Sequence, residues 1–232
     1  MKIVPAQIFI VHASTAESVK IISQAQLEGL PIKCETCTHY LLLEMDKLRE
    51  ENGHLYICSP PLRRKDDRLA LWRAAKSGPI DLITSDDAGL PSVLRTELAN
   101  GSFANVPSGM PGIEPRLTLL YSEGVRKGHI DWPRLVELTS TNPAKVFGMY
   151  PQKGNLFPGA DGDITMFDPK ISWTMKANTL HMNTDFCPFE GWQVFGKTKK
   201  LISRGTLILD EYKIVGKPGH GKRIFRRLSN TN

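Results

Sequence analysis

The sequence is poor in cysteine and has no long apolar run. Its 232 residues include only four cysteines, at irregular spacings: Cys34, Cys37, Cys58 and Cys187. Such a set favours reduced thiols over a disulfide scaffold. No apolar run approaches the ~20 residues that span a bilayer, and the first residues lack the pattern of a secretory signal. We therefore expect a cytoplasmic protein with no membrane partner.

Acidic residues are fewer than basic ones. The sequence has 24 Asp and Glu against 30 Lys and Arg, a net charge of +6, and much of this excess lies in the last segment, "KPGHGKRIFRR". A charged run at a terminus is usually a solvated tail. Because no recognised nucleic-acid motif accompanies it, we expect no nucleic-acid partner.

The rest has the composition of an ordinary globular protein, with alternating strand and helix patterns. A strand is predicted over residues 7–12, "QIFIVH", and either Ser14 or Thr15 can cap the helix that follows. Strand patterns recur in "PIKCETCTHYLLL" and in "PIDLITSDD", with the helix pattern "DDRLALWRAAKSG" between them. Three alternations predict a parallel α/β sheet, and the near-continuous apolar character of the first strand predicts burial on both faces.

Beyond Asp87 the pattern changes twice. A loop-like stretch reaches Gly112, and a loop this long is usually functional. Helices are then predicted in "EPRLTLLYSEGVRKG", "DWPRLVELTS" and "NPAKVFG", the last capped by Thr141. Short strands follow in "GDITMFDP", "TKKLISRGTLILD" and "YKIVG". We therefore place a domain boundary near Met149 to Lys153, between domains 1–150 and 151–232.

Two polar residues stand at the carboxyl ends of apolar strands. His12 ends the first predicted strand and Asp86 the third. Since the carboxyl ends of parallel strands share one face, an imidazole and a carboxylate could meet there as metal ligands or as an acid/base pair. By itself His12 could equally be a core histidine bonded to a backbone carbonyl. Cys34 and Cys37, three apart on one strand, face opposite sides, and the sequence has no second CxxC, so packing explains them better than redox or zinc chemistry does.

Several segments carry a resemblance to a known family. They are "IFIVHASTAESV", "ETCTHYLLL", "YICSPPLRRKDD", "DLITSDDA", "VPSGMPGIEPRL", "TSTNPAKVFGMYPQKGNLFPGADGDITMFDP" and "PFEGWQVFGKTKKLISRGTLILDEYKIVGKPGHG". Together they resemble the cyclic amidohydrolases: dihydropyrimidinase, hydantoinase, allantoinase and, more distantly, dihydroorotase. The ending is similar to the dihydropyrimidinase and hydantoinase branch, whereas "ETCTHYL" and "CSPPLR" are also similar to allantoinase.

The resemblance implies a fold and a chemistry. It implies that domain 1–150 is part of a metal-dependent (β/α)8 barrel (a TIM barrel), strands 6 to 8 with their helices, and that domain 151–232 is a β-sandwich segment with a basic tail. It implies two divalent metal ions, usually zinc, with manganese or iron as alternatives. These activate a hydroxide that opens a cyclic amide or ureide. His12 matches a metal ligand, and Asp86 matches the aspartate that binds metal and takes the proton.

Further residues are carried over by the resemblance. Ser59 matches a position whose main chain contacts the ring, and Pro111 falls where dihydropyrimidinases commonly have a substrate-binding asparagine. Because proline has no amide hydrogen, Pro111 favours a divergent hydantoinase-like specificity. His39 and Asp87 are expected near the metal site without binding metal directly.

The family also uses a His-x-His pair, a carboxylated lysine and a further histidine. The sequence contains no His-x-His, so it resembles the second half of an amidohydrolase. We expect a truncated chain that is inactive alone and a homotetramer for the full-length form. The alternatives are an allantoinase and a noncatalytic dihydropyrimidinase-like scaffold. The presence of both His12 and Asp86 speaks against the scaffold.

Overall fold

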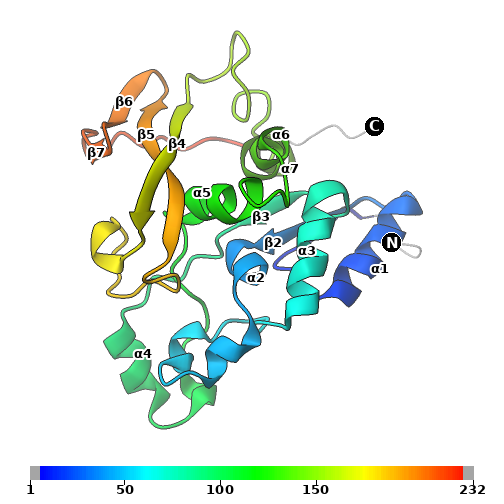
Figure 1. Cartoon of the computed structure of the whole chain (residues 1–232). Helices are drawn as coiled ribbons and strands as arrows, with labels where there is room; N and C mark the ends of the chain where they lie inside the picture. The colour runs from blue at the N-terminus through cyan, green and yellow to red at the C-terminus, as the bar shows by residue number, and fades with distance from the viewer. Residues whose placement is uncertain (1–5, 227–232) are drawn as a thin grey trace.

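The protein contains two sheets, seen in a computed structural model that describes residues 6–226 (Figure 1). The first sheet is parallel, in the order β1 (Ile8–Ile10), β2 (Ile32–Cys37) and β3 (Leu82–Thr84). The second is antiparallel, in the order β4 (Ile164–Thr174), β5 (Gln193–Ser203), β6 (Thr206–Asp210) and β7 (Lys213–Ile214). The predicted change from a parallel α/β unit to an all-β unit is therefore present, but β4 and β5, of 11 residues each, are not the short strands that were predicted.

Helices connect and cover these strands. The α-helices are α1 (Ala16–Leu27), α2 (Thr38–Leu42), α3 (Lys65–Ser77), α4 (Ser92–Ala99), α5 (Arg116–Leu119), α6 (Trp132–Val136) and α7 (Asn142–Val146). Short 3₁₀ segments are η1 (Met45–Arg49), η2 (Gly53–Tyr56), η3 (Phe103–Asn105) and η6 (Ala177–Thr179), and π-helical turns are η4 (Leu120–Val125) and η5 (Glu137–Thr141). None of the helices in residues 6–226 combines the length and apolar character needed to cross a membrane.

The first helix begins at one of the two predicted caps. Thr15 is the N-cap of α1: its hydroxyl accepts the Ser18 amide, and Ser18 returns a bond to the Thr15 amide, so two free N–H groups are satisfied. Val19 and Ile22 form the buried stripe of this helix, as predicted, and α1 lies beside α3 (Figure 1). The cap thus fixes where the chain turns from β1 into its covering helix.

The prediction of a fully buried first strand was wrong. β1 is three residues long, and Ile8 keeps 36% of its surface exposed. The reason is its place at one end of the sheet, where within the described residues only β2 pairs with it. Its apolar side chains therefore lie on a strand edge rather than between two layers.

The stretch predicted as a loop between Asp87 and Gly112 contains α4 and η3, and two strand boundaries also differ from the sequence prediction. The strand predicted to run through "CTHYLLL" ends at Cys37, and α2 replaces the rest. The third strand ends at Thr84, two residues before Asp86. Apolar runs do not distinguish a buried strand from a short buried helix, which explains the first error.

The segment after Asp131 is one continuous helix, not two. Thr141 has helical dihedral angles and no capping bond, and α6, η5 and α7 follow one another directly. Pro143 lacks the amide hydrogen that a regular helix would use, and the π-helical turn lies just before it. The hydroxyl of Thr141 instead donates to the Gly154 carbonyl at 2.8 Å.

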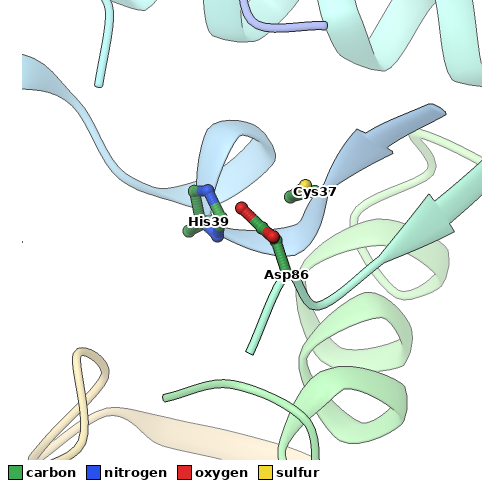
Figure 2. Close-up of side chains that lie close together, drawn as sticks. All are labelled: Cys37, His39 and Asp86. Atoms are coloured by element: carbon green, nitrogen blue, oxygen red, sulfur yellow. The ribbon is translucent and has the colours of Figure 1, made fainter. Parts of the chain in front are cut away.

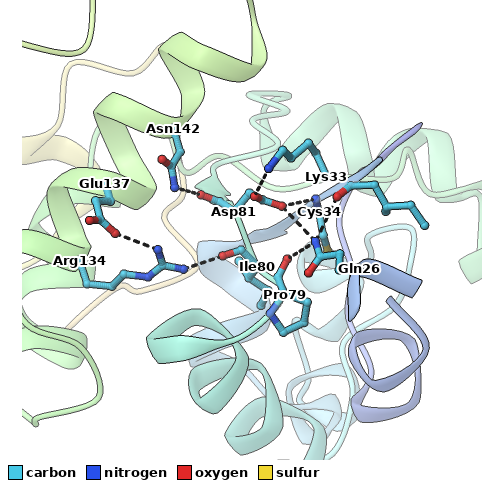
Figure 3. A network of polar contacts seen from close by, with 10 residues as sticks. Gln26, Lys33, Cys34, Pro79, Ile80, Asp81, Arg134, Glu137 and Asn142 are labelled. Carbon is cyan, nitrogen blue, oxygen red and sulfur yellow. Dashed lines mark hydrogen bonds and ion pairs between the residues drawn. The ribbon is translucent and has the colours of Figure 1, made fainter. Parts of the chain in front are cut away.

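The start of β3 is tied to its neighbours by a polar network (Figure 3). The Asp81 carboxylate accepts the Cys34 amide and the Lys33 ammonium group, each at 2.9 Å. From the other side Asn142 donates to the Asp81 carbonyl at 2.8 Å, while Arg134 donates to the Ile80 carbonyl. These contacts join β2 and β3 to the continuous helix formed by α6, η5 and α7. They thereby fix the sheet that positions the candidate site.

Candidate functional site

His12 and Asp86 occupy equivalent places in the sheet. Each lies two residues beyond the end of its strand, β1 or β3, and each has a positive φ, 42° for His12 and 47° for Asp86. A left-handed residue other than glycine is costly, by about 1–2 kcal/mol, and such residues cluster at functional sites. The backbone therefore leaves the strand conformation at both residues, at the same end of the sheet.

The Asp86 carboxylate lies in a cluster with two residues from β2 and α2. One potential ligand atom each from Cys37, His39 and Asp86 lies within 4.8 Å of the other two. Figure 2 shows the Asp86 carboxylate directed toward the His39 ring, with Cys37 beside it. Cys37 and His39 are buried and Asp86 is exposed, so the cluster opens to solvent on the Asp86 side.

Burial dominates the electrostatics of this cluster. It lowers the pKa of His39 to about 4, with the charge of His12 acting in the same direction and a hydrogen bond to the Ser85 backbone opposing both. Burial likewise raises the pKa of the Cys37 thiol. At neutral pH the His39 ring is therefore neutral, which is the form that binds metals.

Glu35 is a buried carboxylate that the sequence analysis did not consider. It is 7% exposed, and burial raises its pKa. Hydrogen bonds from the His12 backbone and the Thr84 side chain oppose that shift. Glu35 therefore links the ends of β1 and β3 and helps hold the turn at His12.

The structure brings His12 near this region without placing it in the cluster. The charge of His12 acts on both Glu35 and His39, and that of Asp86 acts on Glu35. The three-residue cluster in the described chain nevertheless contains Cys37 and His39 in place of His12. His39, expected near the metal site without binding metal directly, contributes a ring nitrogen to this cluster.

Asp87 is hydrogen-bonded to the loop that contains Pro111. The Asp87 carboxylate accepts the amides of Gly112 at 2.7 Å and Ile113 at 3.0 Å. It therefore holds the loop that carries Pro111, which is itself buried. Because Asp87 directly follows Asp86, the loop and the cluster are fixed by consecutive residues.

Ser59 is exposed on a second loop, and the main chain before and after it is held by hydrogen bonds. Tyr40, which follows His39, donates its hydroxyl to the Pro60 carbonyl at 2.5 Å. Before Ser59, the Ile57 carbonyl accepts the Gly109 amide at 2.9 Å. The loops that carry Ser59 and Pro111 are thus joined to each other and to the residues next to the cluster.

A pattern in the sequence could have revealed Glu35 and Cys37. They are two residues apart in a strand, so their side chains share a face, and a glutamate within a buried strand is unusual. His39 could not be placed in this way, because the strand gives way to α2 at Thr38.

The chain is similar to known proteins over most of its length. A family model described as "Amidohydrolase family" matches residues 9–208, so the chain belongs to the amidohydrolase family. Within it, the D-hydantoinase of Geobacillus stearothermophilus is 40% identical over 95% of this chain, and the D-hydantoinase of Streptomyces coelicolor is 39% identical over 93%. The resemblance seen in the sequence motifs is confirmed.

Solved structures give the same result. A D-hydantoinase crystal structure superposes with a TM-score of 0.95 at 38% identity over 97% of this chain, and a dihydropyrimidinase from Brevibacillus agri gives 0.89 at 42% over 91%. The chain covers 47% and 46% of the two D-hydantoinase sequences and 50% and 46% of the two structures. It thus spans about half the length of its relatives.

Proposed function

We propose that this chain is the C-terminal part of a cyclic-amide hydrolase of the hydantoinase and dihydropyrimidinase type. Residues 1–150 would supply strands 6 to 8 of a (β/α)8 barrel, and residues 151–232 a β-sandwich segment. The observation that supports this most is the likeness to hydantoinases over nearly the whole chain. The parallel order of β1, β2 and β3, with His12 and Asp86 after the first and third, agrees with it.

The donor groups at the strand ends suit a divalent metal such as zinc. Imidazole and carboxylate are common zinc ligands, and the buried Nε2 of His39 has no hydrogen-bond partner in residues 6–226. In the proposed hydrolase, His12 and Asp86 hold the metal. When bound, such a metal lowers the pKa of water and polarises the amide carbonyl.

The residues of this chain then have separate tasks. Asp86 accepts the proton of the attacking water, and Glu35 steadies the turn that presents His12. The main chain at Ser59 contacts the ring, and Pro111 shapes the pocket without offering an amide hydrogen. Water adds to the ring carbonyl, the C–N bond breaks, the nitrogen gains a proton and a ring-opened carbamoyl acid leaves.

We infer that residues 1–232 alone have no substantial hydrolase activity. Of the residues that the resemblance assigns as metal ligands, this chain supplies two, and a catalytic zinc usually needs three or more protein ligands. Ring opening of dihydrouracil, hydantoin or allantoin by the purified chain, abolished by Asp86→Ala, would contradict this. Such a panel also separates the allantoinase alternative from the hydantoinase type.

A chimera tests the catalytic proposal. The corresponding half of the Geobacillus stearothermophilus D-hydantoinase is replaced by this chain, and hydantoin opening is measured. We expect activity that falls about 100- to 10,000-fold in Asp86→Ala and His12→Ala, because a proton acceptor and a metal ligand are lost. The exposed Glu51→Ala serves as the control. A folded, active chimera insensitive to both substitutions would refute the roles of His12 and Asp86, and a folded, inactive chimera would favour the scaffold alternative.

A further inference from the structure

Cys37, His39 and Asp86 form a compact group of three different donors. They come from the end of β2, the start of α2 and the turn after β3, and their potential ligand atoms lie within 4.8 Å of one another (Figure 2). Ligand atoms around a tetrahedral zinc ion are about 3.5 Å apart, as follows from bond lengths of 2.0–2.3 Å. Small side-chain rotations would therefore bring the three donors to bonding distance.

The second observation is an unsatisfied nitrogen. His39 is only 4% exposed, and its Nε2 has no hydrogen-bond partner among residues 6–226. A buried polar atom without a partner costs about 1–3 kcal/mol, so it calls for an explanation. A hydrogen bond with the Ser85 backbone orients the ring, as the outer partners of metal-binding histidines do.

Cys37 also differs from an ordinary core cysteine. Its Sγ lies 3.5 Å from the Thr84 hydroxyl, and it faces the Asp86 carboxylate rather than apolar side chains alone. Cys34, three residues earlier in β2, is just as buried but lies outside the three-residue cluster. The two cysteines therefore form a matched pair in which one has metal-binding neighbours.

We propose that Cys37, His39 and Asp86 bind a single thiophilic divalent cation, with zinc as the best match, and leave one coordination position open to water. Sulfur and nitrogen donors together select zinc over magnesium or calcium. On binding, the Cys37 thiol loses its proton to solvent and the thiolate sulfur forms the metal bond. Asp86 is shared with the proposed hydrolase, but Cys37 and His39 replace His12.

This proposal does not depend on the hydrolase function, because it is tested by binding alone. The purified 232-residue chain is stripped with a chelator, dialysed against zinc, and its metal content measured. Cobalt(II) is added to a second, metal-free sample, and absorption is recorded for the band that only a thiolate-bound cobalt gives. We expect one equivalent of zinc and a clear thiolate–cobalt band.

Variants identify the ligands. Cys37→Ser should abolish the thiolate band, and His39→Gln should weaken zinc binding about 100-fold or more. Cys34→Ser, the matched control, should keep both the zinc stoichiometry and the band. Circular dichroism verifies folding, and if Cys37→Ser does not fold, His39→Gln decides.

Two results would overturn the proposal. One is a folded wild-type chain that retains no zinc and gives no thiolate–cobalt band. The other is unchanged zinc binding in the folded His39→Gln variant. An inactive chimera with an intact cobalt band would instead reject the hydrolase function and leave this site standing.

Discussion

Arg95 is the most deeply buried cation of the described chain, with no exposed surface. Its guanidinium group donates to three main-chain carbonyls: Ile57 at 3.1 Å, His54 at 3.3 Å, and Gly109. These carbonyls belong to the two loops that carry Ser59 and Pro111. One side chain therefore sets the distance between the two candidate substrate loops.

We predict that Arg95→Met lowers the free energy of unfolding by about 3 kcal/mol. Methionine fills the space but removes the guanidinium donors, and although the Ile57 carbonyl still accepts the Gly109 amide, each carbonyl left without a donor costs about 1–3 kcal/mol when buried. Arg95→Lys should lower the free energy of unfolding by less, because the lysine ammonium group keeps the charge and can still donate hydrogen bonds. It should not equal arginine, because it lacks the planar guanidinium group that reaches several carbonyls at once. Urea unfolding measures both, with the exposed Arg73→Met as the control. Equal stability of Arg95→Met and Arg73→Met would show that the loops do not depend on Arg95.

Among the strands and helices, side chains satisfy main-chain hydrogen-bonding groups that the short parallel strands leave without a partner. β3 begins only at Leu82, yet the Cys34 amide of β2 is satisfied one residue earlier by the Asp81 carboxylate (Figure 3). The same carboxylate also receives Lys33, and Gln26 of α1 donates to it at 3.4 Å. Asp81 thus acts as an extension of the strand ladder.

We predict that Asp81→Ala destabilises the protein by about 1–3 kcal/mol. The buried Cys34 amide loses its acceptor, and the start of β3 keeps only the main-chain bond from the residue 81 amide to the Cys34 carbonyl. Asp81→Asn should lose less, because the amide oxygen still accepts a hydrogen bond. Hydrogen exchange at the Cys34 amide should rise strongly in Asp81→Ala and only slightly in Asp81→Asn. Unchanged exchange in both variants would contradict the role given to this carboxylate.

At the scale of the whole molecule, the two sheets are joined by one aromatic cluster. Tyr121 of η4 stacks on Trp132 at 4.8 Å between ring centroids and meets Phe167 of β4 edge-on at 5.0 Å. Gly196 of β5 lies against this cluster, and its carbonyl accepts the Trp173 indole N–H at 3.1 Å. The parallel and antiparallel parts therefore share one hydrophobic core.

We predict that Gly196→Ala destabilises the protein more than Gly205→Ala does. Both glycines have positive φ, 82° and 76°, so both substitutions carry the left-handed cost of about 1–2 kcal/mol. A Cβ at Gly196 would also collide with the rings of Phe167 and Tyr121. A Cβ at Gly205 would have no other atom of the described chain within 4 Å, apart from its chain neighbours. We expect an additional loss of about 1–3 kcal/mol in thermal or urea unfolding. Equal losses of stability in the two variants would show that Phe167 and Tyr121 can move aside without a cost in free energy.

The sequence determined the family and much of the order of the elements, although it missed α2 and α4. Periodicity identified the αβ alternation, a cap at Ser14 or Thr15 and the later change to an all-β segment. The motifs identified the family. These features are local, because caps, turns and alternating side chains depend on neighbours within a few residues.

Only the tertiary structure decided which side chains meet. The exposure of β1 depends on which strands pair, and the helix at Thr38 replaces a strand whose apolar pattern fits both forms. The cluster of Cys37, His39 and Asp86 joins residues up to 49 positions apart in the sequence. The left-handed turns at His12 and Asp86 were likewise visible only in the structure. Such contacts arise from the packing of strands, which no short stretch of sequence specifies.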